Sequence, residues 1–160
     1  MSKAAAVALA VPLMLDPLAG ERPHGYFPFA LDQQRGTAIA VAGAKAITGT
    51  LCGGVDATMI EGVRDGKPWS VMAEFAGARV AAIEAVYRED SGAPEACAIA
   101  AARRAAALPG GANTSFAADW AGLARVARAA WTNGTASYAA TARSFPDGQC
   151  DVTLRVRKAD

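Results

Sequence analysis

Few residues of this chain have the type and spacing that catalysis requires. The 160-residue sequence has a single histidine, His24, so any Ser-His or Cys-His mechanism would depend on a residue near the N-terminus. We interpret His24 as a surface or turn residue instead. The sequence contains none of the G-x-S-x-G, H-E-x-x-H or P-loop patterns that mark common hydrolases, metalloproteases and nucleotide-binding proteins. It therefore predicts no catalytic residues.

Two other groups of residues resemble parts of a site. Residues 49–54 read GTLCGG, but they lack the G-K-[ST] ending of a phosphate-binding loop and are interpreted as a turn. Glu61 and Glu74 are expected on the same exposed face of a hairpin, where two carboxylates could share a proton or hold a cation. Solvated surface charge is the simpler interpretation of both. We therefore predict no metal site and no cofactor.

The three cysteines, Cys52, Cys97 and Cys150, are widely separated and form no C-x-x-C pair. This spacing does not match the pattern of a zinc site or of a thioredoxin-like redox motif. In an oxidising compartment one pair could form a disulfide, which would leave the third thiol free. The sequence does not assign that pair, and three buried reduced thiols are an equally good interpretation.

The C-terminal part of the chain carries the most specific candidate for a binding surface. An Asp-Gly step at residues 147–148 predicts a hairpin across residues 138–158. In the register centred on that step, Arg157 lies opposite Tyr138, and Arg155 is displayed on the same outward face. Arginine beside tyrosine is enriched at the energetic centres of interfaces, because it combines planar hydrogen bonding with stacking. We therefore predict that Tyr138, Arg155 and Arg157 contact a partner, with a solvated polar face as the plain alternative.

A second hairpin is predicted earlier in the chain, within residues 55–75. The Asp-Gly step at 65–66 favours a two-residue turn, because both central residues of such a turn need positive φ. This register sets Ile60 opposite Val71. The core face then carries Ile60, Trp69, Val71 and Phe75. In the C-terminal hairpin, the corresponding register places Arg143 among apolar neighbours, where it would need a carboxylate partner or an edge position.

The remaining elements are assigned from periodicity and capping residues. Residues 37–51 are interpreted as a strand, and residues 78–90 show the apolar spacing of a helix, although an alternating strand also fits. Ser-Gly-Ala-Pro at 91–94 predicts the start of a helix over 95–108. The strongest helix prediction covers residues 116–131. Its apolar side is formed by Phe116, Trp120, Leu123, Ala127 and Trp131.

Residues 1–20 have the layout of a secretory signal peptide. Lys3 supplies the basic residue, residues 4–15 form an apolar run, and the segment ends in small residues. The apolar run is too short to span a bilayer, which takes ~20 residues. We therefore predict an exported protein, with a signal-like segment at 1–20 and a single globular domain at 21–160. The alternatives are a first core element of a cytoplasmic domain and an anchor buried in an assembly.

Composition narrows the range of partners. The net charge is +1, and no run of five Lys or Arg residues occurs, so nucleic acid is not an expected partner. The chain is 52% hydrophobic, with much of the excess in alanine, so few large side chains build the core. The preference for Arg over Lys and the alanine runs suggest a bacterial source.

Together these features predict an α+β domain, in which an antiparallel sheet built from two Asp-Gly hairpins is packed on one side by two or three helices. The predicted function is that of a periplasmic or secreted accessory or binding protein without catalytic activity, with a protein partner and no transmembrane span. A structural subunit of a larger assembly is the alternative. A small enzyme that uses carboxylates or a free cysteine is a further alternative.

Overall fold

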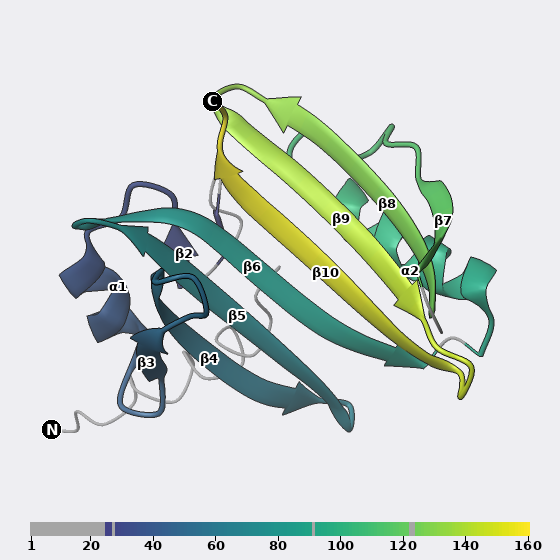
Figure 1. The fold of residues 1–160 in the computed structure, drawn as a ribbon, viewed down its shortest axis with the longest axis horizontal. Helices are drawn as coiled ribbons and strands as arrows, with labels where there is room; N and C mark the ends of the chain where they lie inside the picture. Colours follow the sequence, from purple (N-terminus) through teal and green to yellow (C-terminus); the bar gives the residue numbers. More distant parts are fainter. Residues whose placement is uncertain (1–24, 27, 91, 122–123) are drawn as a thin grey trace, which may run out of the picture.

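In a computed structural model, the described residues form an eight-stranded antiparallel sheet, a small two-stranded ribbon and two helices (Figure 1). The structure describes residues 25–26, 28–90, 92–121 and 124–160. The predicted α+β class with an antiparallel sheet is therefore confirmed. The signal-like segment at 1–20 and His24 lie outside the described residues.

The elements follow one another in an order that differs from the order of the strands in the sheet. In sequence order they are β1 (Gly25–Tyr26), β2 (Phe29–Ala30), α1 (Arg35–Ala42), β3 (Ile47–Thr50), β4 (Asp56–Arg64), β5 (Lys67–Ala76), β6 (Arg79–Asp90), α2 (Pro94–Ala106), β7 (Ala117–Ala121), β8 (Ala124–Asn133), β9 (Ala136–Ser144) and β10 (Gln149–Lys158).

Two antiparallel meanders share the sheet. Its strand order is β3-β4-β5-β6-β10-β9-β8-β7, so each meander contributes four consecutive strands. They meet where β10 pairs with β6, from Gln149 opposite Asp90 to Arg157 opposite Ala82. We call this central β6–β10 pairing the seam. Helix α2 connects the last strand of the first meander to the first strand of the second.

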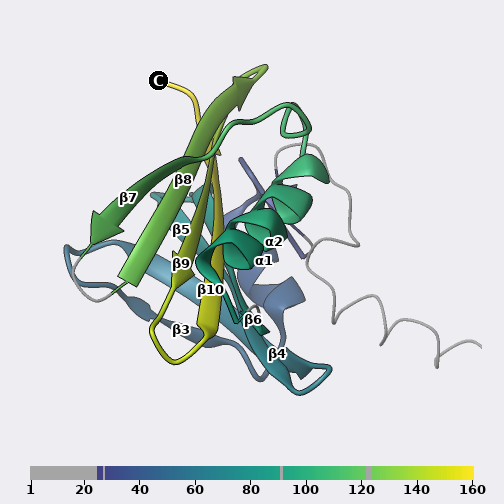
Figure 2. The same cartoon turned by 90° about the vertical axis from the view of Figure 1, so that its right-hand side faces the viewer.

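Both helices lie on the same side of the sheet (Figure 2). Helix α2 packs against β9, β10 and β6, and α1 packs against β4 and β6. We call this side the covered face and its reverse the open face. Large buried side chains of the covered face each stabilise the fold by about 1.5–3 kcal/mol relative to exposure. They include Trp69, Val71, Phe75, Ile83, Tyr87, Val152, Leu154 and Val156.

The pairing of β4 with β5 has the register expected from the sequence. Ile60 lies opposite Val71, and both turn residues, Asp65 and Gly66, have positive φ. The adjacent pairing of Gly62 with Trp69 depends on the missing side chain of glycine, since a Cβ at Gly62 would lie 2.6 Å from the indole ring.

The register expected for β9 and β10 is wrong by one residue. Cys150 lies opposite Ser144, and the Gly148 N–H donates to the carbonyl oxygen of Phe145. Pro146 fixes φ near the value needed at the second position of a type I turn, so the loop has three residues and only Gly148 takes positive φ. Because side chains alternate along a strand, this shift reverses the two faces of β9.

Two assignments of secondary structure also differ from the expectations, and a third segment that fitted a helix or a strand is a strand. Residues 37–51 contain the end of α1 and strand β3 rather than one strand, and the helix predicted over 116–131 is replaced by β7 and β8. Residues 79–90 form strand β6, as the alternating pattern allowed. Apolar residues four positions apart share a face in a helix and in a strand alike, so the spacing in 116–131 does not separate the two. The helix predicted at 95–108 is confirmed as α2, with Pro94 in its first turn.

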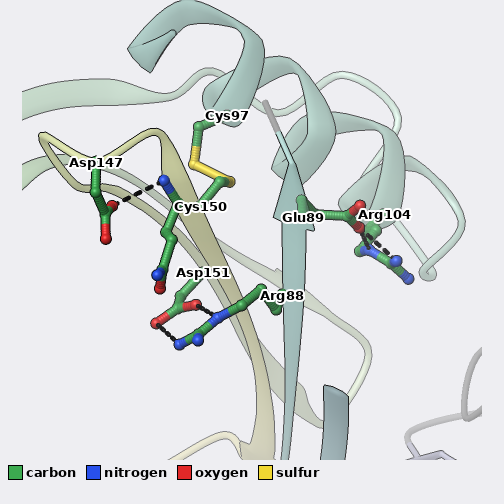
Figure 3. The surroundings of a disulfide bond; sticks show 8 residues. Arg88, Glu89, Cys97, Arg104, Asp147, Cys150 and Asp151 are labelled. Carbon is green, nitrogen blue, oxygen red and sulfur yellow. Dashed lines mark hydrogen bonds and ion pairs between the residues drawn. A yellow bond between two sulfur atoms is a disulfide. The ribbon is translucent and has the colours of Figure 1, made fainter. Parts of the chain in front are cut away.

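A disulfide joins the two meanders through α2. It links Cys97 in α2 to Cys150 in β10, with the two cysteines 53 residues apart (Figure 3). The C-terminal end of α2 is held to β6, because Arg104 donates a 2.7 Å hydrogen bond to Glu89. Cys52 is a free, exposed cysteine. Neither of the described helices is long and apolar enough to cross a membrane.

Candidate functional site

The three residues that the sequence grouped as a binding site lie close together on β9 and β10, but their side chains point to different faces. Arg155 and Arg157 lie on the open face, as expected. Tyr138 pairs with Val156 and lies on the covered face, 3% exposed. Its ring stacks on Trp131 with centroids 5.4 Å apart. The Tyr138 ring is therefore part of the core, although the residue also borders, together with Arg155 and Arg157, the hollow described next.

A shallow hollow of about 410 Å³ adjoins these arginines over strands β8, β9 and β10. Strand pairing arranges its lining in two cross-strand rows, and small or short side chains on β8 and β9 leave space beside the longer arginines of β10. The first row is Ala130, Ala139 and Arg155, and the second is Thr132, Ser137 and Arg157.

Arg155 is held by carboxylates from the first meander. Its guanidinium donates two hydrogen bonds of 2.7 Å to Glu74 and one of 3.2 Å to Glu84. Hydrogen bonding to Glu74 raises the pKa of Arg155 despite the opposing effect of burial. Glu74 therefore neutralises an arginine and is not paired with Glu61, which lies four residue pairs further along the strands, opposite Ser70. The expected solvated surface charge therefore does not describe Glu74, which is engaged in an ion pair with Arg155.

A second ion pair crosses the seam on the same face. Arg88 of β6 lies opposite Asp151 of β10 and donates hydrogen bonds of 3.0 and 3.5 Å to its carboxylate (Figure 3). Hydrogen bonding and charge attraction from Asp151 raise the pKa of Arg88. Arg88 and Arg155 are thus both engaged within the protein, and they bind the meanders to each other.

The remaining arginines of the open face are more exposed. Arg157 is 56% exposed at its side chain, with Asp160 at 3.7 Å. Arg143 lies opposite Asp151, and Arg128 lies opposite Thr141, so both share this face with Arg157. We call Arg128, Arg143 and Arg157 the basic strip. The position opposite Arg143 is Asp151. Arg157 follows it six positions later in β10, which corresponds to about 20 Å along a strand.

Sequence reasoning missed two members of the basic strip. Arg128 was assigned to a helix, and Arg143 was expected among apolar neighbours because of the register error. Pro146 carries the signal that would have corrected Arg143, since a proline just before Asp-Gly favours a type I turn with a following left-handed glycine. That loop turns Arg143 to the open face.

The glycine-rich segment at residues 49–54 forms a turn at the end of β3. Residues 49–54 end β3 and enter the loop before β4, which agrees with a turn. In this loop the Gly54 N–H donates to the Leu51 carbonyl oxygen, and Thr50 donates to Asp56. Across the ranges that the structure describes, no three His, Cys, Asp or Glu side chains gather to hold a metal ion.

Comparison with models of protein families, with curated proteins and with solved structures finds no match to this chain.

Proposed function

We propose that this protein is an exported binding protein without catalytic activity, and that its basic strip holds an extended acidic segment of a protein partner. The carrying observation is that three exposed arginines, Arg128, Arg143 and Arg157, lie together on the open face. Complementary charge selects a partner and speeds its association more than it adds affinity.

The disulfide supports export to the periplasm or the medium. Disulfides persist in oxidising compartments and are rare in the cytosol of most cells. The bond between Cys97 and Cys150 is consistent with the signal-like layout of residues 1–20, which would direct the chain across a membrane.

The geometry of the open face favours an extended acidic segment. A strand-like peptide advances about 3.3 Å per residue, so six or seven residues would span the ~20 Å of the basic strip. Exposed ion pairs contribute about 0.2–1 kcal/mol each and are screened by salt. We therefore expect weak binding at low ionic strength that salt reduces strongly.

A fluorescent peptide of eight glutamates tests this proposal by anisotropy at 10 and 150 mM salt. Arg128→Glu combined with Arg157→Glu should abolish binding. Arg103→Glu is the matched control, because Arg103 is an exposed residue of α2 on the other side of the sheet. Equal loss in the control, or no binding to the wild type at low salt, would contradict the proposal.

A structural subunit of an assembly remains the second candidate, supported by the edge strand β3. Ile47 on this strand is 55% exposed, and Leu51 and Val55 in the adjoining loop are also exposed. Edge strands with exposed apolar residues readily pair with other chains. Light scattering after size-exclusion chromatography should then show an oligomer, and Ile47→Lys should dissociate it. Val63→Lys is the control and should leave the oligomer intact, because Val63 is an exposed apolar residue of β4 rather than of β3. A monomeric wild type would remove this candidate.

A further inference from the structure

A half-open cavity lies on the covered face, away from the basic strip. It has a volume of about 340 Å³ and is bounded by the N-terminal half of α2 and by strands β7, β8 and β9. This volume falls at the small end of the range for small-molecule sites, roughly 300–1,000 Å³. Most of its wall is apolar, formed by Pro94, Ala98, Ala118, Ala127 and Ala142.

One end of this cavity is polar. Arg125 and Ser144 lie directly opposite each other on β8 and β9, and both line the cavity. Ser144 is only 7% exposed, and its hydroxyl can donate one hydrogen bond. A hydroxyl removed from bulk water gains from an acceptor, and the cavity is where such an acceptor could lie.

Glu95 occupies the mouth of the cavity beside this polar end. Its carboxylate lies 3.6 Å from the Arg125 guanidinium, and its side chain is 76% exposed. A long, exposed ion pair of this kind holds its partners weakly. Glu95 can therefore turn into solvent and give up its own place beside the guanidinium to another anion.

We propose that this cavity binds a small aliphatic carboxylate. The alkyl chain lies against the alanine methyl groups, and the carboxylate accepts hydrogen bonds from the Arg125 guanidinium and the Ser144 hydroxyl in place of Glu95. Charge-assisted hydrogen bonds of this type are stronger than neutral ones, so the charge of the head group decides which ligands bind. The site lies on the covered face and does not depend on the proposed function of the open face.

Calorimetric titration of the intact protein with octanoate, octanol and octylamine tests the proposal. Octanoate should bind most tightly and octylamine least. Arg125→Gln should weaken octanoate by about tenfold or more, as loss of a hydrogen bond to a charged group does, and should leave octanol unchanged. Glu95→Gln should strengthen octanoate, because it removes the competing carboxylate. Preferred binding of octylamine that Glu95→Gln abolishes would overturn the proposal.

A matched pair of helix variants locates the binding site. Ala98→Leu fills the cavity and should prevent octanoate binding, whereas Ala102→Leu makes the same change one turn later in α2, outside the cavity lining. Circular dichroism should show the folded protein in both cases. Octanoate binding that survives Ala98→Leu in a folded variant, or that Ala102→Leu removes equally, would place the ligand elsewhere and overturn the assignment.

Discussion

The guanidinium of Arg155 in β10 reaches across β6 to bind the carboxylate of Glu74 in β5 through two 2.7 Å hydrogen bonds. Glu84 of β6, directly opposite Arg155, joins the same group. This ion-pair network connects three consecutive strands of the sheet on its open face. It therefore ties the second meander to the first by side chains as well as by backbone pairing.

Removing this network should destabilise the fold. Arg155→Ala leaves two half-buried carboxylates close together, and we expect a loss of about 1–2 kcal/mol, the value of charged hydrogen bonds reduced by solvent screening. Urea denaturation measures the change. Arg157→Ala two residues further along β10 serves as control, because its side chain is more exposed. A control that loses as much stability as Arg155→Ala would show that the network contributes nothing specific.

Asp56 should contribute to stability above pH 4 and lose that contribution in acid. Hydrogen bonds from Thr50 and Arg35, together with the charge of Arg35, lower the pKa of Asp56. A carboxylate whose pKa is lower when folded stabilises the protein above its unfolded pKa of about 4 and ceases to do so as pH falls through the folded pKa. The difference in urea midpoint between wild type and Asp56→Asn should thus be constant from pH 7 to 5 and shrink below pH 4. A difference that grows in acid would have the wrong sign.

The disulfide should stabilise the fold by constraining the unfolded chain. Closing a loop between residues 53 positions apart corresponds to about 4 kcal/mol in the chain-entropy model. The double change Cys97→Ala and Cys150→Ala should lower the free energy of unfolding by an amount of this order. Cys52→Ala should have little effect, since Cys52 is exposed and unbridged. Non-reducing peptide mapping that joins Cys52 to either partner would contradict the assignment.

Two glycines should respond oppositely to alanine. A Cβ at Gly111 would lie 1.8 Å from the carbonyl oxygen of Ala105, so Gly111→Ala forces the backbone apart and should cost roughly 1–3 kcal/mol. Gly36 lies in α1 with nothing near the Cβ position. Gly36→Ala should stabilise the protein by up to about 1 kcal/mol through helix propensity. Thermal denaturation of both variants gives the comparison, and similar behaviour of the two would refute this view of residues 105–111.

The two hairpins show how far turn chemistry alone predicts register. Asp65-Gly66 stands between strands with no proline beside it, and the predicted pairing agrees with the structure. Asp147-Gly148 follows Pro146, which adds a residue to the loop and moves the register by one. The outward position of Arg155 and Arg157 was still predicted correctly, because the error did not change which face each residue of β10 occupies. The face of Tyr138 was predicted wrongly, because the one-residue shift exchanges the two faces of β9.

The helical interpretation of residues 116–131 failed because small side chains carry little periodic information. Alanines lie on both faces of β8, and Trp131 is four residues from Ala127, a spacing shared by the two structures. Pairing with β9 decides the outcome. The Asn133-Gly134 step at the β8–β9 turn is a local signal for this hairpin, but the same step also suits the end of a helix. The alanine-lined cavity could not be predicted for a related reason. Its wall combines α2 with strands β7, β8 and β9, which come together only through contacts between segments distant in sequence.

The position of β10 between β6 and β9 also sets when folding can finish. Both strands that pair with β10 are synthesised before it. The β6 edge of the first meander therefore has no partner strand until β10 has been made. Contacts so distant in sequence form slowly. The two meanders can therefore join into one sheet only after residues 149–158 have been made, whereas the hairpins within each meander connect strands that are close in sequence.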